Sequence, residues 1–284
     1  MYGGSGRYGL WRHVSILRYK MERSTGGRQM SECILCQVRR AEKPFYIEST
    51  GLNIYSVEEL IYFMISNLPL LDQEFMTGEL IRWIKDELRM KRLAQNLVIL
   101  TKQEFRVRDT LLMLYREGGY PDAVMMKKAL EELTVLESRP SYDRIKRKGD
   151  TLVKHRRFLK AADIYQNVLD MKEKEGYGAQ YMGVIYNNIG YVYAKMFQME
   201  EAVSYFRQAY ELLHTKASLK SYLYAVYLKD GEKAYRQLAE EAGLDAETEA
   251  EMERELSGLK TPRMPEDLED TLRKWVDQYH LVCE

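Results

Sequence analysis

The sequence is poor in the residues that build disulfide frameworks, metal centres and proton-transfer sites. Its 284 residues include three cysteines and four histidines. An odd number of cysteines does not make a disulfide framework. No apolar run approaches the ~18 residues of a membrane-spanning helix. No signal-peptide core is present either, because Arg12 and His13 interrupt residues 9–17. We therefore expect a cytoplasmic protein with no membrane partner.

The chain also lacks an excess of either charge, since Lys+Arg and Asp+Glu both number 43. A net charge of zero argues against bulk electrostatic binding to nucleic acid or to an anionic membrane. The charges are nevertheless clustered. Residues 139–160 carry nine Lys and Arg against Asp143 and Asp150, and residues 240–255 carry eight acids against Arg254. Solvated helix faces explain such blocks. The alternative is that the basic block meets an acidic partner.

Catalytic motifs are absent from the sequence. It contains no H-E-x-x-H, no G-x-S-x-G and no phosphate-binding G-x-x-x-x-G-K-[ST] pattern. His155 and His214 fall near the ends of predicted helices, where a cationic side chain stabilises terminal carbonyl groups. We prefer that role to catalysis. The sequence therefore predicts a protein that is not an enzyme and needs no cofactor.

A pair of cysteines at Cys33 and Cys36 has the two-residue spacing of metal ligands, but a zinc site needs four ligands. The chain ends with a second such spacing at His280 and Cys283. A zinc site built from these four residues would join the two ends of the protein. We favour thiols without a metal, and the redox alternative lacks the βαβ context it requires.

The first 29 residues are rich in Gly, Ser and Arg, and Glu22 is their only acid. We expect residues 1–29 to be a disordered tail or a mis-assigned start, with Met30 as the true first residue. A basic targeting peptide is the alternative. We expect residues 30–138, which follow this segment, to form an N-terminal helical domain.

Within that domain, residues 44–50 predict an extended segment, and helix signals follow. Ser56 and Glu59 form a capping-box pattern, and Thr77 is placed to cap the next helix. Further helices are predicted at 91–102, 104–117 and 121–137, the last with Pro121 at its first position. The pair spanning 104–137 would be a degenerate repeat or a cap.

The most informative stretch is residues 183–214, which predict two amphipathic helices joined at 196–199. Small and aromatic side chains recur at helical spacing on both helices. The first helix carries Tyr186, Gly190 and Tyr193, and the second carries Ala202, Phe206 and Ala209. Small residues let two helices approach, and the rings fill the space between them. This pattern resembles the tetratricopeptide repeat, with Ile189 in place of its usual Leu and His214 in place of its closing Pro.

Two further stretches match the repeat more weakly. Residues 142–173 place Gly149 and Tyr165 where Gly190 and Phe206 stand later, although Lys148 occupies a position that prefers an apolar residue. Residues 217–242 place Tyr224, Ala225 and Leu228 on a first helix. The resemblance implies an all-α solenoid of helical hairpins over residues 139–243. Helices at 246–258 and 265–281 would cap it within residues 244–284.

In tetratricopeptide arrays the first helix of each repeat lines a concave groove that binds peptides. Carrying those positions over gives the candidate groove residues Lys146, Asp150, Asn187, Tyr191 and Lys195. An Asn side chain both donates and accepts, so Asn187 would hold a peptide backbone unit. Lys146 and Lys195 would meet a carboxylate, but Asp150 argues against a true carboxylate clamp. The alternative is that all five are simply exposed polar positions.

Two functions follow from the resemblance. The first is a scaffold or adaptor that binds a protein or peptide segment in the groove. The second is a peptide-responsive regulator, in which the repeats sense a peptide and the helical unit at 44–137 acts on an enzyme or on DNA. We prefer the first, because that unit shows no DNA-recognition helix.

Overall fold

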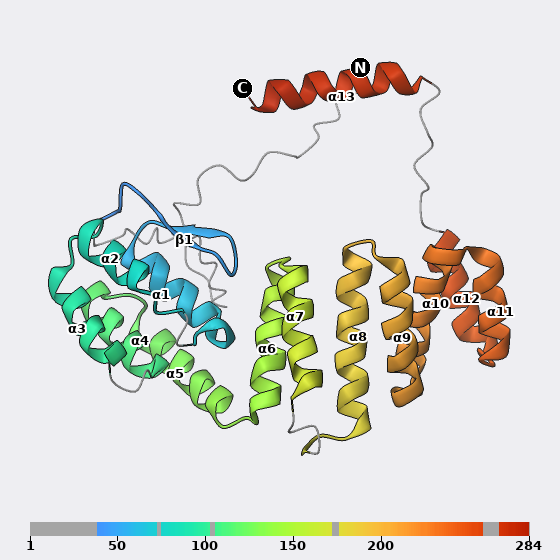
Figure 1. The fold of residues 1–284 in the computed structure, drawn as a ribbon, viewed down its shortest axis with the longest axis horizontal. Helices are drawn as coiled ribbons and strands as arrows, with labels where there is room; N and C mark the ends of the chain where they lie inside the picture. Colours follow the sequence, from blue (N-terminus) through green and yellow to red (C-terminus); the bar gives the residue numbers. More distant parts are fainter. Residues whose placement is uncertain (1–38, 73–74, 103–105, 172–175, 258–266, 284) are drawn as a thin grey trace, which may run out of the picture. The chain divides into compact units, whose positions relative to one another are not determined.

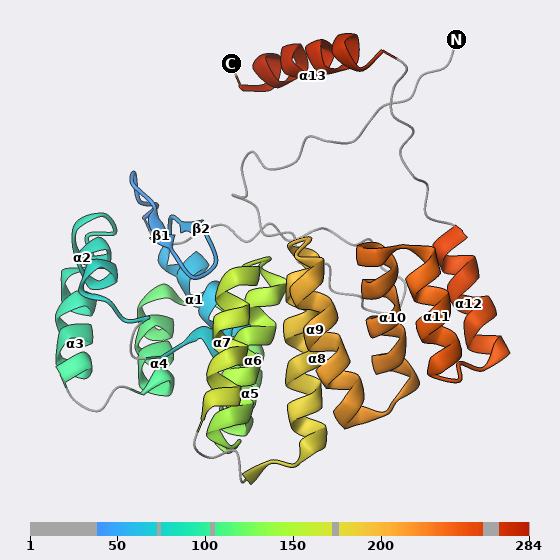
Figure 2. The ribbon, with the colours of Figure 1, turned by 45° about the vertical axis from the view of Figure 1, so that its right-hand side comes forward.

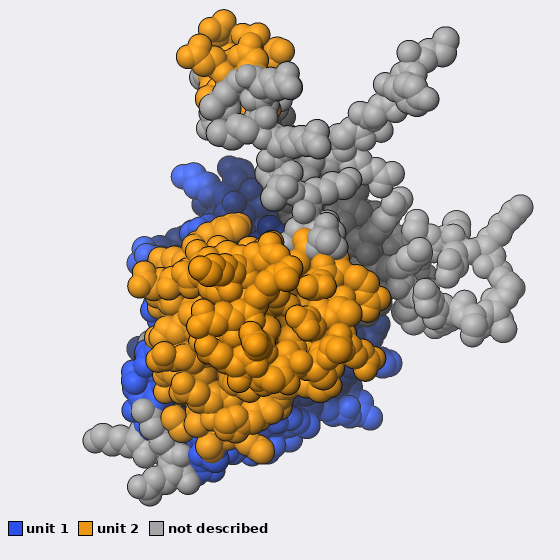
Figure 3. Space-filling view, turned by 90° about the vertical axis from the view of Figure 1, so that its right-hand side faces the viewer, with its two compact units in different colours: residues 1–178 blue, residues 179–284 orange. Residues whose placement is uncertain are grey.

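The structure is a computed structural model that describes residues 39–72, 75–102, 106–171, 176–257 and 267–283. Thirteen α-helices and one short β-hairpin make up these residues (Figure 1). The chain divides into two compact units, residues 1–178 and residues 179–284 (Figure 3). Within each unit, neighbouring helices pack on one another, which confirms the predicted all-α, helical-repeat architecture. The domain boundaries drawn from the sequence stay a prediction.

A β-hairpin precedes the first helix. Strand β1, Phe45–Ile47, pairs antiparallel with strand β2, Leu52–Ile54, and Phe45 lies opposite Ile54. Gly51 has a φ of +73°, a left-handed conformation that glycine adopts without strain. The sequence predicted only the first extended segment. The second strand, which has the same length of three residues, was not predicted.

Five helices follow in unit 1, and their starts test the predicted caps. They are α1 Val57–Ser66, α2 Gly78–Asp86, α3 Lys91–Lys102, α4 Val107–Gly118 and α5 Ala123–Glu137. Ser56 accepts a hydrogen bond from the Glu59 amide at 3.2 Å, as predicted. Glu59 reaches back to the amide of Tyr55, one residue earlier than a capping box requires. Thr77 accepts from Leu80, which confirms that cap.

The start of α5 differs from the prediction. Pro121 lies before the helix, and Asp122 is the N-cap, accepting from the Met125 amide at 2.8 Å. A carboxylate at this position satisfies a free amide, which Pro121 at the first helical position does not do. The helix α4 packs on α1 and α3, and Arg108 crosses from α4 to donate to Thr134 on α5.

The first repeat-like hairpin consists of α6, Ser141–Lys154, and α7, Phe158–Asp170. Its helix α6 also packs on the 3-10 helix η1, Leu68–Leu70. This neighbour explains why Lys148 stands where the repeat prefers an apolar residue. The Lys148 ammonium forms an ion pair with Asp72 at 2.6 Å. The helix therefore meets the N-terminal helical region at this point with a charge, not with an apolar side chain.

His155 lies at the helix end where it was predicted, but its surroundings disfavour the cationic form. His155 is the C-cap of α6, as expected, but its Nε2 lies 2.6 Å from the Asn67 side-chain oxygen. Burial lowers the pKa of His155, and the positive charges of Arg157 and Lys154 lower it further. The imidazole is therefore neutral near pH 7 and donates a hydrogen bond to Asn67.

This contact predicts a loss of stability at acidic pH. The folded-state pKa of His155 lies below the ordinary value of about 6.5, so the unfolded chain binds more protons between the two values. The stabilisation is complete above about pH 6.5 and is lost as the pH falls through the folded-state pKa. We expect the thermal midpoint of wild type to fall more steeply between pH 7.5 and 5.5 than that of His155→Gln. Equal slopes would contradict the assignment, and His214→Gln is the control.

Unit 2 contains the clearest repeat. Its helices are α8 Ala179–Lys195, α9 Met199–Leu213, α10 Lys216–Asp230, α11 Glu232–Glu241, α12 Ala246–Ser257 and α13 Leu268–Cys283 (Figure 2). The helices α8 and α9 form a closely packed antiparallel hairpin. A Cβ atom on Gly190 would lie 2.8 Å from the Phe206 ring. Ala202 is fully buried in a cluster with that ring, and Ala209 is fully buried on the same helix. The predicted small-against-aromatic packing is confirmed.

The third repeat-like hairpin, α10 with α11, matches the prediction in part. Ala225 is buried against Ala202 and Phe206, as the repeat pattern requires, whereas Leu228 is 56% exposed. Leu219 and Leu223 are also buried, in a cluster with Tyr235 of α11 and Met252 of α12. The helix α12 thus packs on the end of this hairpin. Of the helices in the described residues, none is long and apolar enough to cross a membrane.

Candidate functional site

Three predicted groove residues lie along one face of α8. Asn187, Tyr191 and Lys195 are four residues apart, which places them one above another on a helix. The Tyr191 ring is 44% exposed. The Lys195 ammonium lies over that ring at 5.3 Å from its centroid, a geometry in which ring and cation attract. We call Asn187, Tyr191 and Lys195 the α8 face.

Asn187 differs from the other two residues in its hydrogen bonding. Its side-chain oxygen is shielded from solvent and has no hydrogen-bond partner among the described residues. An acceptor that is shielded and unpaired costs about 1–3 kcal/mol. Because the oxygen is out of contact with solvent, a ligand donor reaches it only if the side chain turns outward. The α8 face therefore combines an exposed ring and a cation with an acceptor that is buried and unpaired.

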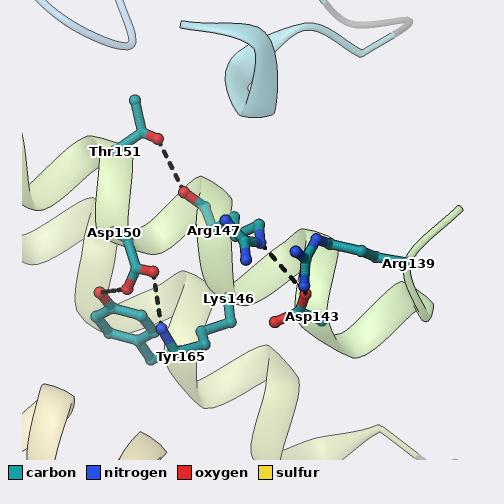
Figure 4. Close-up of polar contacts among 7 residues, drawn as sticks. All are labelled: Arg139, Asp143, Lys146, Arg147, Asp150, Thr151 and Tyr165. Carbon is teal, nitrogen blue, oxygen red and sulfur yellow. Dashed lines mark hydrogen bonds and ion pairs between the residues drawn. The ribbon is translucent and has the colours of Figure 1, made fainter. Parts of the chain in front are cut away.

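The other two predicted groove residues lie in unit 1 and form a closed polar network on α6. The Lys146 ammonium contacts the Asp150 carboxylate at 2.8 Å. The Tyr165 hydroxyl on α7 donates to the second oxygen of Asp150, also at 2.8 Å (Figure 4). The charge of Lys146 is cancelled within its own helix. This arrangement agrees with the expectation that no carboxylate clamp is present here.

The basic block at 139–160 is largely used inside unit 1. Arg139 and Arg147 both donate to the same Asp143 oxygen, at 2.9 and 3.2 Å (Figure 4). Burial by itself raises the pKa of Asp143, but the two guanidinium groups outweigh it and hold that pKa below its usual value. Lys160 pairs with Glu48 of the hairpin region at 2.9 Å. Together with Lys146 and Lys148, five of the nine cations of the block therefore pair with an acid inside unit 1.

The candidate zinc site falls outside what the structure describes. Cys33 and Cys36 are not among the described residues, and neither are the side chains of His280 and Cys283. Within the described part of the chain, no group of three or more His, Cys, Asp or Glu side chains is placed to hold a metal ion. The zinc set stays a prediction, as do the tail at 1–29 and the start at Met30.

The structure therefore places the five predicted residues in two sets, Lys146 with Asp150 in unit 1 and the α8 face in unit 2. One neighbour was missed from the sequence. Val184 is a partly exposed apolar side chain three residues before Asn187, on the same side of α8. Its helical spacing from Asn187 was the available signal.

Antiparallel helix pairs that meet through glycine and alanine against aromatic rings define a helical-hairpin repeat protein. Residues 184–212, from α8 to α9, match the family model of the tetratricopeptide repeat. The chain therefore contains a tetratricopeptide repeat, at the place that the sequence pattern indicated. Tetratricopeptide repeats are in general protein-interaction modules. No curated protein is significantly similar to the chain in sequence.

Proposed function

We propose that the protein is a scaffold or adaptor that holds a protein or peptide segment on the α8 face. The observation that carries the proposal is the exposed Tyr191 ring, with Lys195 beside it, within the tetratricopeptide repeat. If the Asn187 side chain turns outward when a segment binds, its oxygen, which is unpaired and buried in the free protein, would accept a backbone N–H of that segment. The Asn187 amide would donate to the next carbonyl, because the side chain has both functions.

Tyr191 and Lys195 give the proposed surface its selectivity. The exposed Tyr191 ring would pack against an apolar side chain of the segment. Lys195 stands at the end of α8 and would favour an acidic side chain at the matching position. In unit 1, Lys146 and Asp150 already neutralise each other, so a ligand gains little from the charge of either.

A recovery experiment tests the proposal. Tagged wild type and the double variant Asn187→Ala/Lys195→Ala are used to recover partners from native lysate, with quantification by mass spectrometry. Loss of the acceptor and the cation should reduce recovery of the specific partner about tenfold or more, which corresponds to about 1.4 kcal/mol. The expected result is a selective loss, with the folded state unchanged by circular dichroism.

The matched control is Ser204→Ala/Arg207→Ala, which removes one polar and one cationic side chain from exposed positions on α9. This control should recover the partner as wild type does. Equal recovery by wild type and by Asn187→Ala/Lys195→Ala would exclude the α8 face as the binding surface.

A further inference from the structure

The helix α12 is attached to its neighbours by apolar contacts and by charge. Among its described side chains, Met252 is the single apolar one that is fully buried, in the cluster formed by Leu219, Leu223, Tyr235 and Ala239 of the preceding hairpin. Leu256 of α12 and Leu244 just before the helix are partly buried against the same cluster. The apolar anchor of α12 is therefore Met252 together with Leu256.

A stripe of polar contacts supplements this anchor. Lys216, Lys220 and Tyr224 follow one another at four-residue spacing along α10, so they share one side of that helix. The Lys216 ammonium contacts Asp245, just before α12, at 2.7 Å. The Lys220 ammonium lies 3.0 Å from Glu251 and 4.0 Å from Glu255.

The stripe ends at a hydrogen bond from the Tyr224 hydroxyl to the Glu255 carboxylate. Burial raises the pKa of Tyr224, and the hydrogen bond to Glu255 raises it further, so the hydroxyl stays protonated and donates. Glu251 and Glu255 are themselves one helical turn apart. The cations of α10 and the acids of α12 therefore match in spacing as well as in sign.

We propose that the α10–α11 surface is a docking site for an acidic amphipathic helix whose apolar side packs on Leu219 and Leu223, and that α12 is its releasable intramolecular occupant. Charge complementarity and the seated helix α12 both carry this assignment. Release of α12 uncovers Leu219 and Leu223, and an acidic helix of a partner then takes the same place. This site is separate from the α8 face and does not depend on it.

The dependence of hydrogen exchange on salt concentration distinguishes a releasable helix from a permanent part of the core. The Debye length falls from about 10 Å at 0.1 M salt to about 3 Å at 1 M, and the acids on α12 are about half exposed. Hydrogen exchange of the full chain should show protection of α12 amides falling at least tenfold between 0.05 M and 1 M NaCl. Protection of α9 should change much less. Unchanged protection of α12 would overturn the proposal.

Charge reversal gives the same test by mutation. Lys220→Glu faces two acids and should reduce α12 protection about tenfold or more at low salt. Adding Glu251→Lys and Glu255→Lys should restore it. The control is Arg236→Glu, which breaks an exposed pair with Glu232 on α11 and leaves the α10–α12 contacts intact. Equal protection in Lys220→Glu and wild type would contradict the electrostatic attachment.

Docking in trans is tested with a synthetic peptide of residues 244–257. The acceptor is the full chain carrying Met252→Asp, which expels α12 by placing an unpaired charge in an apolar cluster. The peptide should bind this variant at least tenfold more tightly than wild type, where α12 occupies the site, and should weaken in 1 M NaCl. A peptide with Glu251→Lys and Glu255→Lys should not bind.

Failure of the wild-type peptide to bind a Met252→Asp chain that remains folded by circular dichroism would overturn the docking site. If that variant unfolds, the salt and Lys220→Glu exchange measurements on otherwise intact chains decide the question alone. None of these measurements depends on partner recovery through Asn187 and Lys195, so the two proposals fail independently.

Discussion

Gly190→Leu is expected to destabilise unit 2 by about 3 kcal/mol, at the upper end of the usual range for overpacking a core. A Cβ atom at this position alone would lie 2.8, 2.9 and 3.0 Å from three carbons of the Phe206 ring. The ring has little room to retreat, because it is buried in a cluster with Ala202 and Ala225. The rest of a leucine side chain would force α8 and α9 apart.

Urea unfolding followed by circular dichroism measures this loss, and the transition that shifts should be that of unit 2. Gly178→Leu is the matched control, because a Cβ atom there meets nothing within 4 Å. Adding Phe206→Ala to Gly190→Leu should return part of the stability, with a coupling energy of about 1 kcal/mol or more. Similar losses at Gly190 and Gly178 would refute the close packing of this hairpin.

Tyr165→Ala is expected to destabilise unit 1 by about 3–5 kcal/mol, the usual range for truncating a buried aromatic residue. The Tyr165 side chain is 2% exposed. Its ring fills the space over Gly149, where a Cβ atom would lie 2.6 Å away. Its hydroxyl donates to Asp150. Truncation therefore leaves a cavity between α6 and α7 and removes a hydrogen bond to a carboxylate.

Tyr165→Phe separates the two contributions, because it keeps the ring and removes only the hydroxyl. We expect a loss of about 1.5 kcal/mol, the lower end for hydrogen bonds to charged groups. The low end applies because Asp150 is partly exposed and keeps its contact with Lys146. Unfolding in urea measures both variants. If the alanine variant lost no more than the phenylalanine variant, the ring would not be a packing element of this hairpin.

The predictable parts of the fold are those encoded by short-range spacing. The hairpin of α8 and α9 was predicted because Gly190, Ala202 and Phe206 recur on faces separated by helical turns. The weaker repeat match at α6 and α7 was predicted for the same reason, and Gly149 there packs against the Tyr165 ring. The third hairpin was placed in the right stretch, and Ala225 is buried at its repeat position, but Leu228 on the same helix is largely exposed.

The candidate site was predicted in part. The sequence indicated which helix positions would share a face, and the α8 face has that arrangement. It did not indicate that Lys146 would be neutralised through a network that includes Tyr165 of the next helix. Nor did it reveal that the Asn187 oxygen would lack a partner. These properties depend on side chains from neighbouring turns and helices, whose positions follow only from packing.

By itself, the sequence determined that this is an all-α protein with a tetratricopeptide repeat at its centre, because helical periodicity and small–aromatic alternation are local properties of a chain. The tertiary structure alone decided which polar side chains meet. Lys148 pairs with Asp72, His155 with Asn67 and Lys220 with Glu251. Each of these partners is separated by many helical turns of sequence, so only the packing of whole helices brings their side chains within reach.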